Sequence, residues 1–149
     1  MQNMTSALAF IFERDLNKLA GELQAFQREE NLWSTAGHIT NPAGNLCLHL
    51  VGNLNTYIGN ILGNNGYKRD REAEFSLKNI PKTELVQLVE QTKVTVCHTL
   101  GKLPDEQLQQ PYPQQVLGYD MTTGFFLVHL SGHLSYHLGQ INYLRRVLE

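Results

Sequence analysis

Apolar residues recur at every third or fourth position along four separate segments of the chain, and this periodicity constrains the fold more than any other feature. A repeat of this length places the apolar side chains on one face of an α-helix. The four sets are Leu8, Phe12, Leu16, Leu19, Leu23 and Phe26; Leu46, Leu50, Leu54, Tyr57 and Ile61; Leu85, Leu88, Val89, Val96 and Leu100; and Phe126, Leu130, Leu134, Ile141, Leu144 and Leu148. The pattern predicts four amphipathic helices.

Residues that favour helix ends flank these segments. Short polar side chains can accept a hydrogen bond at a helix start, proline fits the first turn, and glycine favours the end. The expected start signals are Thr5 or Ser6, Asn41 with Pro42, Pro81, and Asp120 or Thr122, and the expected end signals are the run 63–66 and Gly101. Only residues 73–77 and 114–119 allow short extended pieces, so the chain is expected to be all-α.

Four long helices in 149 residues predict a four-helix bundle formed by a single domain over residues 1–149. The connections between the first and second helices, and between the second and third, are long enough to cross the length of a bundle. An up-down-up-down arrangement is therefore not required.

The composition excludes several classes of protein. The formal net charge is −2, which lacks the basic excess typical of nucleic-acid binders. No apolar run approaches the roughly 20 residues of a membrane span, and residues 1–12 lack the features of a signal peptide. Cys47 and Cys97 lie far apart in apolar stretches and are expected to be reduced thiols. These features predict a cytoplasmic protein that binds neither nucleic acid nor membranes.

Three of the six histidines follow one another at four-residue spacing: His129, His133 and His137. Neighbours at this spacing are about 6 Å apart along a helix, so two imidazoles can reach one metal ion. The outer two are about 12 Å apart, so the three do not share one ion. His38 and His98 lie near a helix connection and a helix end, where they are expected to face solvent.

A helical wheel selects between the two possible pairs. With about 100° per residue and Phe126 at zero, the centre of the apolar face lies near about 40°. His137 falls at about 20°, His133 at about 340° and His129 at about 300°. The wheel therefore predicts that His133 and His137 face the bundle interior and that His129 lies at its flank.

A third ligand is expected from a facing helix, because two histidines rarely complete a metal site. His49 in the second helix is the best candidate. It shares a polar lane with Asn53, Thr56 and Asn60, and polar groups inside a bundle need partners. A network of hydrogen-bonded histidines without metal is the alternative interpretation. Three neutral imidazoles suit Zn²⁺, Ni²⁺, Fe²⁺ or Mn²⁺ and leave coordination positions open.

Three stretches of the sequence resemble a known family. Residues 133–141 read His-Leu-Ser-Tyr-His-Leu-Gly-Gln-Ile, which resembles the last-helix signature His-x-x-x-His-x-Gly-Gln-Ile of the DinB-like (YfiT-like) metalloprotein superfamily. Residues 44–54, Gly-Asn-Leu-Cys-Leu-His-Leu-Val-Gly-Asn-Leu, resemble its second-helix histidine motif. With residues 66–75, Gly-Tyr-Lys-Arg-Asp-Arg-Glu-Ala-Glu-Phe, the chain looks closest to an uncharacterised subgroup of that superfamily.

The resemblance implies a four-helix bundle with a long crossover between helices two and three, often assembled as a homodimer. It also implies one divalent metal ion, held by one histidine of the second helix and two of the fourth, which correspond to His49, His133 and His137. Characterised relatives include transferases and isomerases that use low-molecular-weight thiols such as bacillithiol or mycothiol. The resemblance thus implies a metal-dependent thiol S-transferase acting on small molecules.

Two other functions remain open at this point: a non-catalytic dimeric bundle with a structural metal or histidine network, and a metal-dependent hydrolase. Leu134 follows His133 where His-Glu-x-x-His enzymes carry glutamate, which disfavours peptide hydrolysis. Arg69 or Arg71 can receive a substrate carboxylate, or else pair with neighbouring acidic residues. Gln140 can orient a metal ligand, or else serve only as an amide at the helix flank.

Overall fold

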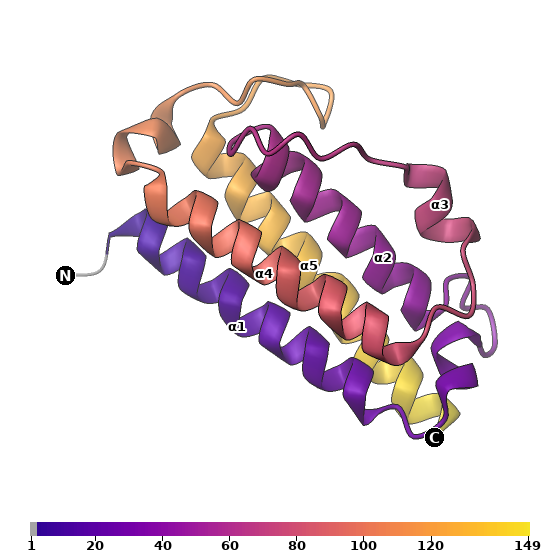
Figure 1. The fold of residues 1–149 in the computed structure, drawn as a ribbon. Coiled ribbons are helices and arrows are strands. Elements are labelled where there is room, and N and C mark those ends of the chain that lie inside the picture. The colour runs from indigo at the N-terminus through magenta and orange to yellow at the C-terminus, as the bar shows by residue number, and fades with distance from the viewer. Residues whose placement is uncertain (1–2) are drawn as a thin grey trace.

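The computed structural model describes residues 3–149, and most of them are helical (Figure 1). Two 3₁₀ turns occupy Glu29–Trp33 and Asp105–Gln109, and a π-helical turn, Asn55–Asn60, continues the second helix. Among the described residues there is no β-strand. The α-helices are α1 (Met4–Ala25), α2 (Ala43–Leu54), α3 (Arg71–Ser76), α4 (Lys82–Lys102) and α5 (Thr123–Leu148).

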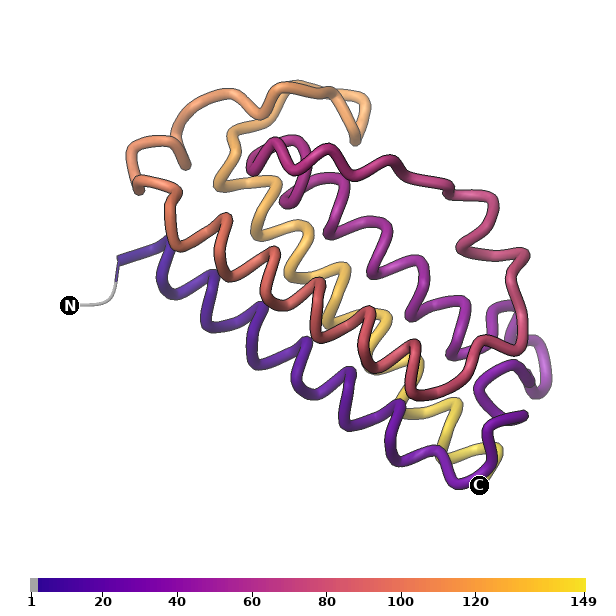
Figure 2. The backbone as a smooth tube through the Cα atoms, in the orientation of Figure 1, coloured from indigo at the N-terminus to yellow at the C-terminus, as the bar shows by residue number. Residues whose placement is uncertain are grey.

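The four long helices α1, α2, α4 and α5 lie side by side, and the short α3 lies outside them (Figure 1). The start of α1 meets the end of α4, because the backbone N–H groups of Met4 and Thr5 donate to Asp105. The tube in Figure 2 shows the chain returning along α2 after residue 61 before α4 begins. Helices α2 and α4 therefore run in the same direction, so the predicted long crossover is confirmed.

The apolar faces predicted from periodicity form one continuous core. The free energy of unfolding gains roughly 1.5–3 kcal/mol from each fully buried Leu or Phe side chain. Tyr57, Ile61, Leu88 and Leu148 are only partly buried and pack against the margin of this core. The fully buried members include Phe12, Leu16, Leu19, Leu23, Leu50, Leu54, Leu85, Leu100 and Phe126.

The predicted cap of α5 is confirmed, but two other predicted helix starts are wrong by one to three residues. Thr122 caps α5 by accepting a hydrogen bond from the N–H of Phe125 at 3.1 Å. The cap of α1 is Asn3, whose Oδ1 accepts from the N–H of Ser6 at 2.8 Å. Pro42 itself occupies the capping position of α2, without a side-chain hydrogen bond. Several adjacent polar residues can serve as a cap, so composition alone cannot choose among them.

Neither of the two stretches that the sequence allowed to be extended forms a strand. Residues 73–77 lie mostly in α3, because Asp70 caps this helix by accepting from the N–H of Ala73 at 3.0 Å. Residues 114–119 form turns and bends, and Gly118 has a φ of +86°, a conformation that a strand does not contain.

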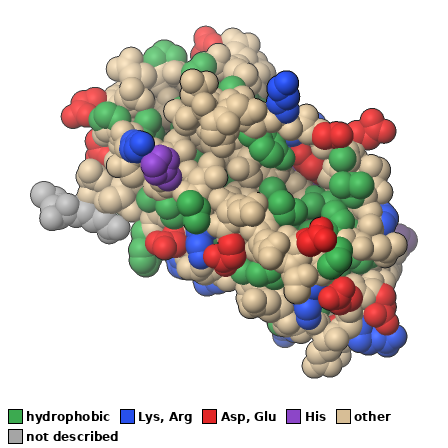
Figure 3. All heavy atoms as spheres, in the orientation of Figure 1, with side chains coloured by type: hydrophobic (Ala, Val, Ile, Leu, Met, Phe, Trp, Pro, Cys, Tyr) green, Lys and Arg blue, Asp and Glu red, His purple; other side chains and the backbone are tan. Residues whose placement is uncertain are grey.

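Two further sequence expectations have structural counterparts. Cys47 and Cys97 are both free, and burial raises the pKa of the Cys47 thiol to about 12. No helix in the described part of the chain combines the length and apolar character needed to cross a membrane. On the face drawn in Figure 3, acidic and basic side chains are interspersed with apolar ones.

Candidate metal centre

Three histidines from two helices meet in the bundle; we call His49, His133 and His137 the histidine cluster. Nε2 of His133 lies 3.2 Å from Nε2 of His49 and 3.1 Å from Nε2 of His137. One ligand atom from each histidine can be chosen so that all three lie within 4.8 Å of one another. The structure thus groups His133 and His137, which spacing and the helical wheel selected, with His49, which the polar lane of the second helix indicated. Their role as metal ligands is still a prediction.

The other histidines lie outside this cluster. His129 is exposed and stacks between Phe126 and His133, with ring centroids 5.8 and 6.5 Å away. His38 and His98 are also exposed. The helical wheel therefore placed His129 correctly at the flank of α5.

Glu74 of α3 holds the outer side of the His49 ring. Its Oε1 lies 3.1 Å from Nδ1 of His49, and Arg69 donates to both carboxylate oxygens, at 2.8 and 3.0 Å. Burial by itself would raise the pKa of Glu74, but the hydrogen bonds from His49 and Arg69 outweigh it and lower the pKa. A carboxylate at this position favours the tautomer with the proton on Nδ1 of His49 and the Nε2 lone pair toward the cluster.

Gly52 makes this approach of Glu74 to α2 possible. A Cβ atom built at Gly52 would collide with the Glu74 carboxylate. A glycine in a helix interior costs roughly 0.5–1 kcal/mol relative to alanine, and here it opens the space that the carboxylate fills.

Gln140 holds the outer side of the His137 ring in the same way. Its Oε1 lies 2.7 Å from Nδ1 of His137, an arrangement that places a proton on Nδ1 and the lone pair on Nε2. Of the two roles left open for Gln140, contact with a candidate ligand is the one that the structure contains. Two lone pairs thus converge on Nε2 of His133, where either a metal ion or a proton on that nitrogen can serve as their partner.

The protonation of the cluster also suits a cation. Burial, followed by the charges of His137 and His49, lowers the pKa of His133 to about 4. Burial is also the largest influence on His137, and it lowers the pKa of that side chain despite the opposing hydrogen bond to Gln140. Histidines that are neutral at pH 7 are in the form that binds metal ions. The residues present therefore fit a divalent metal ion.

A cavity of about 240 Å³ opens onto the cluster, and we call it the histidine cavity. The ring of Tyr57 packs against Phe126 at 5.2 Å between centroids, and the Arg69 guanidinium lies 5.8 Å from the Tyr57 ring. No acidic residue is among the described residues that line it. The lining residues are His49, Asn53, Tyr57, Arg69, Arg71, Val116, Leu117, Phe126, His129, Leu130 and His133.

Comparisons with known proteins place the chain in a family. Residues 7–149 match the family model described as "Protein of unknown function (DUF1572)". The chain belongs to the DUF1572 family. The crystal structure of a DinB-like protein from Bacillus cereus ATCC 10987 is 16% identical, with a TM-score of 0.71 over 90% of this chain and 85% of that one. The predicted membership of the DinB-like superfamily, and its helical bundle fold, are confirmed. A comparison with curated proteins finds no match.

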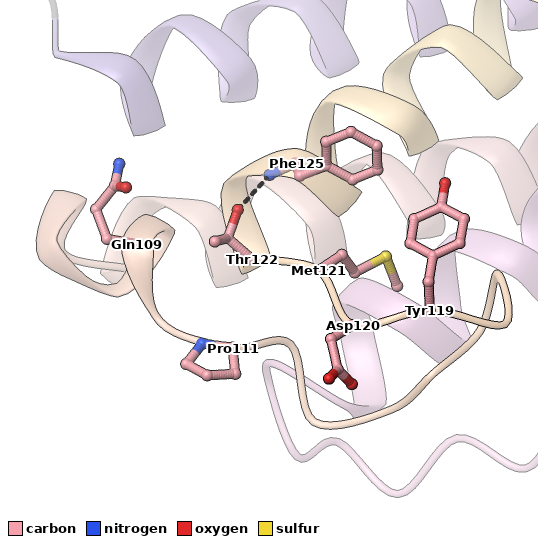
Figure 4. A pocket seen from close by; sticks show the side chains of 7 residues that line it. All are labelled: Gln109, Pro111, Tyr119, Asp120, Met121, Thr122 and Phe125. Carbon is pink, nitrogen blue, oxygen red and sulfur yellow. Dashed lines mark hydrogen bonds between the residues drawn. The ribbon is translucent and has the colours of Figure 1, made fainter.

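Several cavities of this DUF1572 chain are larger than the histidine cavity, and two of them lie at the start and near the end of α5. One, of about 410 Å³ at the start of α5, is lined by Gln109, Pro111, Tyr119, Asp120, Met121, Thr122 and Phe125 (Figure 4). It contains no histidine, and the Asp120 carboxylate accepts a hydrogen bond from Gln115. Another, of about 450 Å³, is lined partly by His38 and Gln140. Neither has the metal-ligating set of the histidine cavity.

Glu74 is the site residue of this DUF1572 chain to which the sequence assigned no role. The sequence showed only that Glu74 is a carboxylate within residues 66–75, and nothing in the spacing linked it to His49. Of the two readings of Arg69, local pairing is the one observed, because its guanidinium binds Glu74. Arg71 lines the histidine cavity and forms no ion pair with another described residue.

Proposed function

We propose that His49, His133 and His137 bind one divalent metal ion, and that the protein is a metal-dependent transferase using a low-molecular-weight thiol on small molecules. The observation that carries the first part is the convergence of three Nε2 atoms, with Glu74 and Gln140 holding the outer nitrogens of two rings. Zn²⁺, Ni²⁺, Fe²⁺ and Mn²⁺ all suit three neutral imidazoles.

The chemistry of the site follows from its donors and its walls. A divalent ion held by three protein ligands acts as a Lewis acid and lowers the pKa of a coordinated thiol or water. The chain supplies the rest: Glu74 and Gln140 orient the ligand rings, while apolar residues such as Phe126 and Leu130 keep water from one wall of the histidine cavity.

We favour a thiol over water as the nucleophile because no free carboxylate lines the described part of the histidine cavity. Hydrolysis by an activated water is usually assisted by a carboxylate or another general base beside it. The described lining of the histidine cavity contains no carboxylate, and Glu74 is engaged by Arg69 and His49. This supports thiol transfer over hydrolysis, and the resemblance to thiol-dependent transferases points the same way.

Metal analysis tests the ligand set. Untagged protein is expected to contain about one divalent ion per chain, and His49→Ala, His133→Ala and His137→Ala are each expected to lose most of it. His38→Ala and His98→Ala are the matched controls, and His129→Ala is expected to retain the ion as well. Retention of metal by the double variant His49→Ala/His133→Ala would contradict the proposal. Loss in His129→Ala with retention in His137→Ala would place the site one turn earlier.

A thiol screen tests the reaction. Fully metallated protein is expected to accelerate conjugation of a low-molecular-weight thiol, such as bacillithiol or mycothiol, to a small electrophile, and chelation is expected to abolish the rate. Absence of metal-dependent turnover across a broad panel would favour the non-catalytic bundle. Metal-dependent hydrolysis without thiol would favour the hydrolase.

We also propose that two copies associate through the outer face of α5. This face carries exposed apolar side chains at helical spacing, including Phe125, Tyr136 and Tyr143, which are 51, 65 and 69% exposed. Gly132 lies between them, where an added Cβ would meet no other atom, so a second helix can approach closely. Light scattering is expected to show a dimer that Tyr136→Lys converts to a monomer and that Val94→Lys, on α4, does not.

The location that we propose is the cytoplasm. The free cysteines Cys47 and Cys97 suit a reducing compartment.

A further inference from the structure

The histidine cavity carries positive charge that no described residue neutralises. The guanidinium of Arg69 is bound to Glu74, but Arg71, the first residue of α3, lines the same cavity without an ion pair or side-chain hydrogen bond to a described residue. No aspartate or glutamate is found among the described lining residues. An exposed arginine can bind a carboxylate through two parallel hydrogen bonds.

Asn53 supplies a second, independent sign of a ligand. Asn53 is only 7% exposed and lines the histidine cavity, and its buried Oδ1 has no hydrogen bond to another described residue. A buried amide without a partner costs about 1–3 kcal/mol. It lies one helical turn beyond His49 on α2, on the polar lane that the sequence revealed. A carboxylate does not satisfy this Oδ1, but the Nδ2 amide of the same side chain can donate to an anion that enters the cavity.

One wall of the histidine cavity is apolar. It is formed by four side chains: Val116 and Leu117 from the connection before α5, and Phe126 and Leu130 from α5 itself. The volume of about 240 Å³ corresponds to about eight water molecules at roughly 30 Å³ each. A small molecule with a compact apolar body fits this space.

We infer that the histidine cavity binds a small carboxylate with an apolar body, its carboxylate received by Arg71 and Asn53. The inference rests on the proposed function, since the bound carboxylate would be the substrate presented to the metal centre. A singly charged group is favoured because only one guanidinium of the cavity is unpaired.

Paired probes test this inference. Phenylacetate and its neutral analogue phenylacetamide are titrated by calorimetry into wild-type protein, both metal-loaded and chelator-treated. Phenylacetate is expected to bind about tenfold more tightly in both forms, because only the anion forms charge-assisted hydrogen bonds with Arg71. Equal affinities for the two probes would overturn the inference. Benzylphosphonate is expected to bind more weakly than phenylacetate, and the reverse order would overturn the choice of a carboxylate.

Two variants test whether Arg71 and Asn53 are responsible for the binding of phenylacetate. Arg71→Gln is expected to retain its metal but lose the preference for phenylacetate. Lys68→Gln removes the same charge from an exposed position of the crossover outside the cavity, and is expected to keep the preference. Asn53→Leu, of similar shape, is expected to weaken phenylacetate binding. Full preference in Arg71→Gln, or unchanged affinity in Asn53→Leu, would contradict the assigned roles.

The two proposals fail in distinguishable ways. If the three histidines do not bind metal, metal analysis shows it directly. The preference for phenylacetate is measured separately in chelator-treated protein, because neither Arg71 nor Asn53 is a proposed metal ligand.

Discussion

Glu74 determines how His49 faces the rest of the histidine cluster. The carboxylate is buried, its pKa is lowered by the hydrogen bonds from His49 and Arg69, and it lies 3.1 Å from Nδ1 of His49. An anion at Nδ1 fixes the tautomer of the imidazole and increases the basicity of Nε2, the other ring nitrogen. Glu74 should therefore have a large effect on metal affinity, although its carboxylate contacts His49 and not the proposed metal position.

Replacing the carboxylate with an amide tests this role. Glu74→Gln preserves the size of the side chain but removes its charge, and metal affinity is expected to fall about 10- to 100-fold. A competition titration with a chromophoric chelator measures the change. Glu72→Gln, an exposed position of the same helix, is the control and should leave the affinity unchanged. Wild-type affinity in Glu74→Gln would show that the charge does not act on His49.

The candidate ligands could be predicted from sequence because each depends on a local rule. Four-residue spacing put His133 and His137 on one face of a helix, and a polar lane identified His49. Glu74 could not be predicted, because its contact with His49 depends on how the crossover packs on α2. No periodicity encodes that packing.

At the scale of elements, the site depends on close packing of α3 against α2. Gly52 leaves room for this packing, because a Cβ atom there would collide with the Glu74 carboxylate. The placement of a six-residue helix is thus tied to the absence of one side chain from a neighbouring helix.

An alanine at this point should separate the two helices. Gly52→Ala is expected to lower the free energy of unfolding by about 1–3 kcal/mol through overpacking, and to weaken metal binding as Glu74 moves. Gly21→Ala in α1 is the matched control: its added Cβ meets no other atom, so it should raise stability by about 0.5–1 kcal/mol. Urea denaturation and metal titration measure both effects. Equal behaviour of the two variants would contradict the tight packing at Gly52.

The two elements that sequence periodicity missed were missed for different physical reasons. In the π-helical turn the N–H of Ile61 donates to the carbonyl of Thr56 and that of Gly63 to Ile58, each five residues back. One such turn changes which side chains face the core without changing the apolar pattern, so the sequence read α2 as continuing to Ile61. The short α3 is too brief for a repeat to be detected, and its start depends on the single cap Asp70.

At the scale of the whole molecule, the partly buried His133 and His137 should make the metal-free protein sensitive to acid. The pKa of His133 is about 4 in the folded protein and about 6.5 in an unfolded chain, so the unfolded chain takes up the proton first as the pH falls. Stability should therefore decrease from about pH 6.5 to about pH 4 and change little below that through this group. The lowered pKa of His137 acts in the same direction.

Urea denaturation of chelator-treated protein at about pH 7 and about pH 5 measures this loss. The part due to His133 is expected to be about 1–2 kcal/mol, less than the full shift implies, because the side chain is only partly buried. His133→Gln should reduce the dependence on pH, and His98→Gln, at an exposed position, should leave it unchanged. A dependence that is equal in His133→Gln and wild type would exclude His133 as its source.

The crossover between α2 and α4 can change in evolution independently of the bundle that carries the histidine cluster. The three histidines belong to the bundle, whereas Arg71, like the Glu74–Arg69 pair, belongs to a segment outside it. Mutations in that segment can alter what enters the cavity with little effect on the packed core. Divergence of ligand preference among relatives should therefore concentrate between residues 61 and 81. A chimera that exchanges this segment between two relatives would carry its preference into an otherwise unchanged bundle.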